Sequence, residues 1–293
     1  MTMCLTRTMN DMFACLLTAT FANSPRLTDV FAIVLTLVLC FWSTAASTQS
    51  ALIELEKPLE HEQKQELADH ALHILGGNAN VIARWSGGIR VALVSEPSSA
   101  ISDHLKKTIQ DIGLLTELDS KVFDTTMITP QDYVELSKRG GQYDFSICEA
   151  DNTDECANLV VLISDVETVR EVATSIPLRD VYQRATEEGK NPYCFFAPFV
   201  TGSMQISQAF IYIREDLADD MKRTCVQEEL FQAFGLFNDA TDSKWFSFNN
   251  KVEPKEITEF DRLLLKTVYS NEFRPGFPAF AVVRKFLQEL DKQ

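Results

Sequence analysis

A short apolar run near the middle of the chain sets the strongest limit on its fold. The run "NLVVLISD" (158–165) is rich in β-branched residues and holds five consecutive apolar side chains. An uninterrupted stretch of this kind is typical of a strand that is buried on both faces of its sheet. With the helical patterns on either side of it, the run predicts a mixed α/β protein.

The chain after residue 50 alternates between helical and strand patterns. Apolar residues recur at helical spacing in 58–77, 99–118, 165–176, 224–237, 257–270 and 277–290. Strand patterns cover 89–96 and 208–216, whereas 187–203 is rich in Gly, Pro and aromatic residues and is predicted to be a loop. No repeat or linker divides this part of the chain, so we expect one domain over 50–293, with a C-terminal subdomain over about 236–293.

The first 49 residues have the pattern of an export signal. The apolar run Val30–Trp42 follows Arg26, and small residues suited to signal-peptidase cleavage come after it. An earlier apolar stretch, Met12–Ala22, makes the leader unusually long, which suggests that translation starts further along the sequence. We expect residues 1–49 to be a leader that makes the protein periplasmic or secreted. If the leader is not cleaved, a segment over about residues 30–49 anchors the protein in the membrane.

The cysteines agree with an oxidising compartment. Of the seven in the chain, four lie after the predicted leader, an even number. We predict two disulfides, Cys148–Cys156, which closes an acidic loop, and Cys194–Cys225, which ties a loop to a helix. The alternative is four buried free thiols. No Cys-x-x-Cys pair indicates a zinc ribbon or a thioredoxin-like site.

The charge balance excludes one class of partner. The chain has 42 acidic and 27 basic residues, which gives a net charge of −15. Binding of nucleic acid requires a basic face that neutralises phosphates, and no run of Lys and Arg is present. We therefore expect no nucleic-acid partner.

The helical pattern "TCVQEELFQAFGLFND" has the spacing of a zinc-protease helix without its histidines. In HExxHxxGxxH, the three His bind zinc, the Glu deprotonates water and the Gly permits a turn. Here Glu228, Gln232 and Asn238 stand at the three ligand positions. Glu229 stands at the general base and Gly235 at the turn. The alternative is an ordinary amphipathic helix with its acidic face in solvent.

The sequence after this helix also resembles the metzincin proteases, which have a Met-containing turn and then a helix with an early Asp and a late Tyr. Phe248 stands at the turn's Met, and Asp261 and Tyr269 stand at the two helix positions. More closely, about 190–277, with the core EExxQxxGLxND, resembles the bacterial family of unknown function 2927. The zincin resemblance implies a mixed sheet with an antiparallel edge strand, packed by helices, and we expect 208–216 to be that edge strand.

The chemistry of these side chains argues against a zinc enzyme. Zinc prefers imidazole and thiolate, and the amide oxygens of Gln232 and Asn238 are weak ligands. An oxygen-ligated cation such as Ca²⁺ or Mg²⁺ suits Glu228, Glu229 and Asp239 better, although this helix alone offers too few oxygens for Ca²⁺. Without a metal, Glu229 has no activated water to use.

Histidine offers little further catalytic chemistry. The chain has four His, all before this helix, and no local motif indicates a Ser–His or Cys–His pair. Glu66, His70 and His73 could share a helix face and hold a metal. His on a charged amphipathic helix is more often simply solvated.

We therefore expect an exported zincin-like domain that binds but does not catalyse, with a peptide or an envelope protein beside the edge strand 208–216. One alternative is a hydrolase with a non-standard site of Glu228, Glu229 and Gln232. Another is a structural polar face that hydrogen-bonds the turn at 246–250. The sequence indicates no oligomeric state.

Overall fold

The computed structural model describes most of the chain after residue 57. The described ranges are 58–76, 80–95, 99–122, 128–139, 148–149, 152–175, 182–183, 193–240, 242–247 and 256–293. All of them belong to one compact unit, Ile53–Gln293. The predicted leader, 1–49, lies outside them. None of the helices in the described ranges has both the length and the hydropathy that a membrane span requires.

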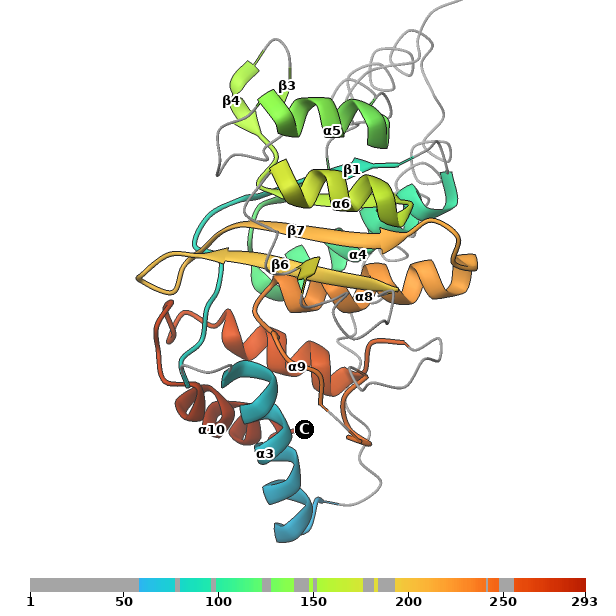
Figure 1. The fold of residues 1–293 in the computed structure, drawn as a ribbon. Coiled ribbons are helices and arrows are strands. Elements are labelled where there is room, and N and C mark those ends of the chain that lie inside the picture. The colour runs from blue at the N-terminus through green and yellow to red at the C-terminus, as the bar shows by residue number, and fades with distance from the viewer. Residues whose placement is uncertain are drawn as a thin grey trace, which may run out of the picture. The chain divides into compact units, whose positions relative to one another are not determined.

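A five-stranded sheet forms the centre of this unit (Figure 1). Its strands are β1 (Ile89–Val94), β2 (Ser120–Val122), β5 (Leu159–Ser164), β6 (Cys194–Val200) and β7 (Ile206–Arg214). They lie in the order β2-β1-β5-β7-β6, and only β6 and β7 pair in antiparallel fashion. A separate antiparallel pair consists of β3 (Cys148–Glu149) and β4 (Asn152–Cys156). The predicted mixed sheet with an antiparallel edge strand is therefore confirmed.

The apolar run that predicts a doubly buried strand forms β5, which pairs with β1 on one side and β7 on the other. All of its residues are buried. Leu159, Val161 and Ile163 belong to the larger hydrophobic core, and Val160 and Leu162 belong to the smaller core. Because successive side chains of a strand point to opposite faces, this run contributes to the cores on both sides of the sheet.

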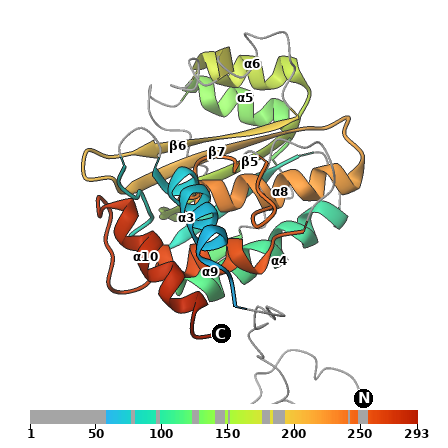
Figure 2. The same cartoon turned by 90° about the horizontal axis from the view of Figure 1, so that it is seen from below.

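Seven helices within the described ranges cover the two faces of the sheet. They are α3 (His61–Gly76), α4 (Ser99–Thr116), α5 (Pro130–Arg139), α6 (Val166–Ser175), α8 (Asp219–Ala233), α9 (Glu259–Val268) and α10 (Ala279–Leu290). Figures 1 and 2 show α5 and α6 on one face, α4 and α8 on the other, and α3, α9 and α10 beyond α8. Every helix predicted from apolar spacing is present, whereas α5 and β2 have no counterpart in the predictions.

The edge of the sheet differs from the prediction. Within the predicted loop 187–203, Cys194–Val200 form β6, and β6 is the antiparallel edge strand. The segment predicted to be the edge, 208–216, mostly forms β7, which lies between β5 and β6. The sequence pattern does not predict β6 because this segment contains Pro198. A proline argues against a strand everywhere except at an edge.

Candidate functional site

A disulfide joins helix α8 to the edge strand. Cys194 at the start of β6 is bonded to Cys225 in α8 with an S–S distance of 2.05 Å, which confirms this predicted pair. Phe196, two residues along β6, stacks on Phe237 just beyond the end of α8, with ring centroids 5.9 Å apart. The strand therefore contacts the chain both before and after 228–232, and the polar part of α8 lies beside the edge of the sheet.

The other predicted disulfide concerns the small β3–β4 pair. Cys156 is disulfide-bonded, and Cys148 lies opposite it in the ladder between these two strands. This register suits the predicted Cys148–Cys156 bond. The bond itself stays a prediction, because the side chain of Cys148 lies outside the described part of the structure.

The end of α8 requires a glycine. Gly235 has a φ of +112°, and a Cβ atom at this position would lie 2.5 Å from the carbonyl oxygen of Ala83. The last carbonyl groups of the helix need partners from elsewhere in the fold. The carbonyl oxygen of Phe234 accepts a hydrogen bond from the hydroxyl of Tyr269 at 3.0 Å. Tyr269, predicted as a supporting residue, therefore stabilises the end of α8.

Two polar side chains of α8 are buried. Glu229 is 5% exposed and Gln232 is 6% exposed, whereas the neighbouring Glu228 is partly exposed. The reason is that α8 packs against α4 as well as against β6 and β7, so more than one side of the helix is covered. A fully solvated acidic face is therefore a wrong description of Glu229 and Gln232.

Burial changes the chemistry of Glu229. Desolvation raises the pKa of its carboxyl group well above the usual value, and the negative charges of Glu228 and Asp239 raise it further. Its buried Oε2 atom has no hydrogen-bond partner in the described ranges. Such an oxygen is rare in native proteins and costs free energy. The carboxyl group therefore lacks an interaction that a bound proton or a ligand would supply.

The two amide side chains at predicted ligand positions make internal hydrogen bonds. Gln232 Nε2 donates to Asp239 Oδ1 at 2.6 Å. Asn238 Nδ2 donates to the carbonyl oxygen of His73 at 2.8 Å, and its backbone N–H donates to that of Ile74 at 3.2 Å. These carbonyls belong to the end of α3, where a helix leaves such groups without internal partners. The structure thus joins Gln232 to Asp239 and directs the amide nitrogen of Asn238 toward α3.

We refer to Glu228, Glu229, Gln232 and Asp239 as the polar cluster. Its three carboxyl groups are close enough for two of them to shift the pKa of the third. No set of three or more His, Cys, Asp or Glu side chains in the described ranges is arranged to hold a metal ion. The cluster therefore gathers negative charge without the convergence on one point that a metal requires.

The weaker metal candidate on α3 has another partner. Glu66 forms an ion pair with Lys244, with 3.0 Å between the two charged atoms. The hydrogen bond from Lys244 lowers the pKa of Glu66. The finding that the described residues contain no metal-holding group also covers Glu66, His70 and His73.

Asp261, the other predicted supporting residue, caps helix α9. It is buried and forms a capping box with Thr258 at the start of the helix. Its Oδ2 also accepts a hydrogen bond from the backbone N–H of Ser247 at 3.1 Å. Burial raises the pKa of Asp261, although the hydrogen bonds from Thr258 and Ser247 oppose this rise. Asp261 thus fixes the segment before α9, while Phe248, predicted for the turn, lies outside the described residues.

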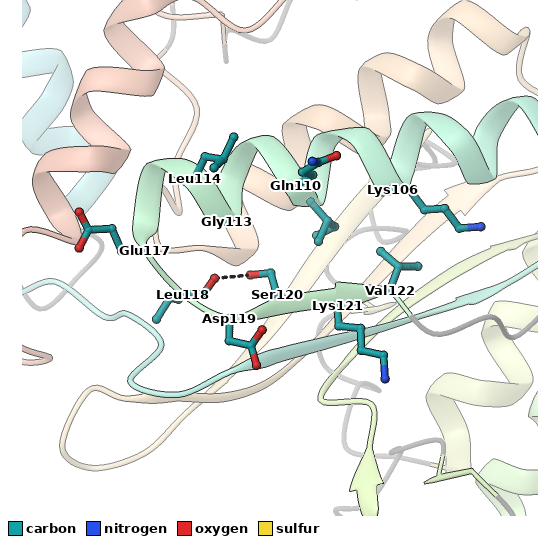
Figure 3. Close-up of a pocket in the computed structure, with 11 residues that line it drawn as sticks. Lys106, Gln110, Gly113, Leu114, Glu117, Leu118, Asp119, Ser120, Lys121 and Val122 are labelled. Atoms are coloured by element: carbon teal, nitrogen blue, oxygen red, sulfur yellow. Dashed lines mark hydrogen bonds between the residues drawn. The ribbon is translucent and has the colours of Figure 1, made fainter. Parts of the chain in front are cut away.

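The opposite edge of the sheet has a hollow that no pattern in the sequence indicates. A cavity of ≈ 740 Å³ lies between α4 and β2 (Figure 3). Leu114, 74% exposed, lines it, with Glu117 toward one end and Lys106 and Lys121 toward the other. A second cavity, of ≈ 370 Å³, has Tyr269 among its lining residues. Because β2 and β6 are the two edges of the sheet, the larger cavity is separate from the polar cluster.

Comparison with known proteins places most of this chain in one family. The family described as protein of unknown function (DUF2927) matches residues 55–288. This range includes the whole sheet, α8 and the polar cluster. Comparisons with curated proteins and with solved structures found no match.

Proposed function

We propose that this chain, which belongs to the DUF2927 family, is an extracytoplasmic binding domain with a zincin-like arrangement that does not cleave peptides with zinc. The observation that carries the proposal is the internal hydrogen bonding of Gln232 and Asn238, at two of the three positions where a zincin has metal ligands. These bonds use the amide nitrogens and fix where each side chain lies. The amide oxygen is a weak zinc ligand and a poor replacement for histidine.

Further features support the arrangement and the location. The antiparallel edge strand, β6, precedes α8 along the chain, and a turn at Gly235 ends the helix. The zincin resemblance implies both features. The Cys194–Cys225 disulfide is consistent with a protein outside the cytoplasm, where such bonds persist.

Metal analysis and zinc titration of the purified protein test the absence of zinc chemistry. We expect substoichiometric zinc and no tight binding, because the cluster lacks imidazole and thiolate donors. The same preparation should leave a library of extended peptides uncut. Stoichiometric zinc that Glu228→Ala removes, together with peptide cleavage, would contradict the proposal.

The outer side of β6 supports binding of an extended segment. Arg214 donates its backbone N–H to the carbonyl of Tyr193 at 2.9 Å, so the backbone groups of Tyr193 face β7. Backbone groups of an antiparallel strand alternate between its two sides, so those of Cys194, Phe196 and Pro198 face outward. No strand in the described ranges pairs with this side. Pro198 has no N–H, and we therefore expect an added strand to pair with β6 only up to Phe196.

Hydrogen exchange tests this strand addition. A bound extended peptide should slow exchange at the amide of Phe196 and leave Phe195 and Ala197 unchanged, because these two already face β7. Phe196→Pro removes the outward N–H and should weaken peptide binding. Phe196→Ala is the matched control, because it removes the same ring and keeps the N–H. Equal affinities of these two variants would contradict pairing at this edge.

A hydrolase with a non-standard site is the second candidate, and the raised pKa of buried Glu229 favours it. Strongly shifted carboxyl groups recur among general acids and bases. Cleavage of any peptide that is abolished by Glu229→Gln, in a variant with unchanged thermal stability, would replace the binding proposal with this one. We expect no cleavage, because the cluster lacks the imidazole and thiolate donors that would hold zinc to activate water.

A further inference from the structure

The polar cluster lies on the stretch of chain that β6 contacts at both ends. The disulfide to Cys225 and the stacking on Phe237 hold β6 against α8 on both sides of the cluster. Phe196, which makes the second contact, also presents its backbone to the open edge. A side chain of a peptide bound at this edge can therefore reach the partly exposed Glu228 and Asp239.

Glu229 adds an independent sign of a ligand. Its side chain is more than nine-tenths buried, and its Oε2 has no hydrogen-bond partner in the described ranges. The charges of Glu228 and Asp239 act on its carboxyl group. Glu229 also stands about one turn of α8 before Gln232, which donates to Asp239. Among the described residues, no positive charge acts on the carboxyl group of Glu229. A cation placed between the three carboxyl groups would lower the free energy of each one.

The geometry favours an organic cation over a metal ion. The carboxyl groups are near one another, but they do not form a set that can hold a metal. A guanidinium group suits such a spread arrangement, because it is planar and offers five N–H donors in a fixed fork. The ammonium of lysine is a more strongly hydrated point charge and fits less well.

We propose that the polar cluster is a recognition site for an arginine side chain of an extended partner. This inference rests on the proposed binding function and specifies the residue that the partner must carry. The arginine contacts the carboxyl groups of Glu228 and Asp239. Glu229 releases its proton when the arginine binds and then supplies further negative charge. The net charge of −15 adds a general attraction for a basic partner.

Blocked amino acids test the site with defined probes. We would titrate the full chain with Nα-acetyl-arginine methylamide and with the citrulline and lysine equivalents. The Gln232 side-chain amide, which donates to Asp239, is the NMR reporter. We expect arginine to bind at least about tenfold more tightly than citrulline, which has the same shape without the charge, and more tightly than lysine. Equal affinity for arginine and citrulline, or no shift of the Gln232 amide, would overturn the proposal.

Variants separate the site from general charge attraction. Glu228→Gln and Asp239→Asn should each weaken arginine binding by about tenfold. Glu135→Gln removes an exposed carboxylate on α5, across the sheet, and should leave binding unchanged. An equal loss in all three variants would show attraction to net charge only. We expect wild type to release a proton when arginine binds, which calorimetry in two buffers detects. Glu229→Gln should abolish this release. Release that persists in this variant would assign the proton to another group.

Failure of this inference and failure of the proposed function are distinguishable. A peptide without arginine that protects the Phe196 amide, combined with no binding of blocked arginine, would overturn the arginine site and leave strand addition intact. Arginine binding at the cluster without any peptide protection at β6 would overturn the strand addition and keep the cation site.

Discussion

Glu229 shows how the fold changes the chemistry of a single side chain. On an isolated helix its carboxyl group would be ionised in water at neutral pH. In the protein it is 5% exposed, close to two other carboxyl groups, and one of its oxygens lacks a partner in the described ranges. Burial and the neighbouring negative charges disfavour the charged form, so the folded protein holds this proton more tightly than the unfolded chain.

We expect Glu229→Gln to reduce the pH dependence of stability. The stabilisation from the raised pKa is complete below the ordinary value of 4.5 and is lost as the pH rises through the folded-state pKa. In urea titrations, wild type should lose about 1 kcal/mol or more between about pH 5 and about pH 8, and Glu229→Gln should lose less. Glu135→Gln, an exposed carboxylate, serves as the control. An unchanged pH dependence in the Glu229 variant would contradict the assignment.

Gly235 is the residue at which backbone conformation limits the sequence most tightly. Its φ of +112° opposes any side chain, and so does the distance of 2.5 Å that would separate a Cβ atom from the Ala83 carbonyl oxygen. We expect Gly235→Ala to lower the free energy of unfolding by about 2 kcal/mol or more, measured by chemical denaturation. Gly87→Ala is the matched control, since a Cβ there meets no atom within 4 Å. Similar losses in both variants would show that the turn tolerates a side chain.

Strand β6 and helix α8 act as one unit because a covalent bond and an aromatic stack connect them. Apolar spacing predicts α8, but the partner strand is hidden, since Pro198 interrupts its pattern. The helix pattern also assigns Glu229 and Gln232 to solvent, because a single helix cannot show that three neighbours cover it. Periodicity thus predicts the element, and packing decides which of its faces are buried.

Removal of the disulfide should loosen this unit. The bond joins residues 31 apart in sequence, so we expect the double variant Cys194→Ser, Cys225→Ser to lose about 3 kcal/mol of stability. Amide exchange should accelerate in β6 and at the start of α8. The amides between β1 and β5 provide the internal control, because the bond does not touch them. Unchanged exchange in β6 would show that the aromatic contact alone holds the strand.

The five-stranded sheet has a core on each face, and β5 contributes to both cores. This arrangement predicts cooperative folding, because neither core can form without that strand. A chain that begins at Ile53 should therefore unfold in one transition. Trp85 and Trp245 remain in such a chain, so their fluorescence can be compared with far-ultraviolet circular dichroism. Transitions that do not coincide would contradict a single folding unit.

Local patterns were sufficient for the fold class, six of the helices, the central strand and the Cys194–Cys225 bond. Each depends on spacing, composition or cysteine count that is visible in the sequence itself. The position of β6, the burial of Glu229 and the bonds of Gln232 and Asn238 depend on how the elements pack. The bond of Asn238 to α3 joins residues 165 apart in sequence. Spacing could align Asn238 with a zinc ligand, but it could not show that α3 takes up its amide group. The helix motif can therefore be recognised from the sequence, while its chemistry depends on the residues that pack around it.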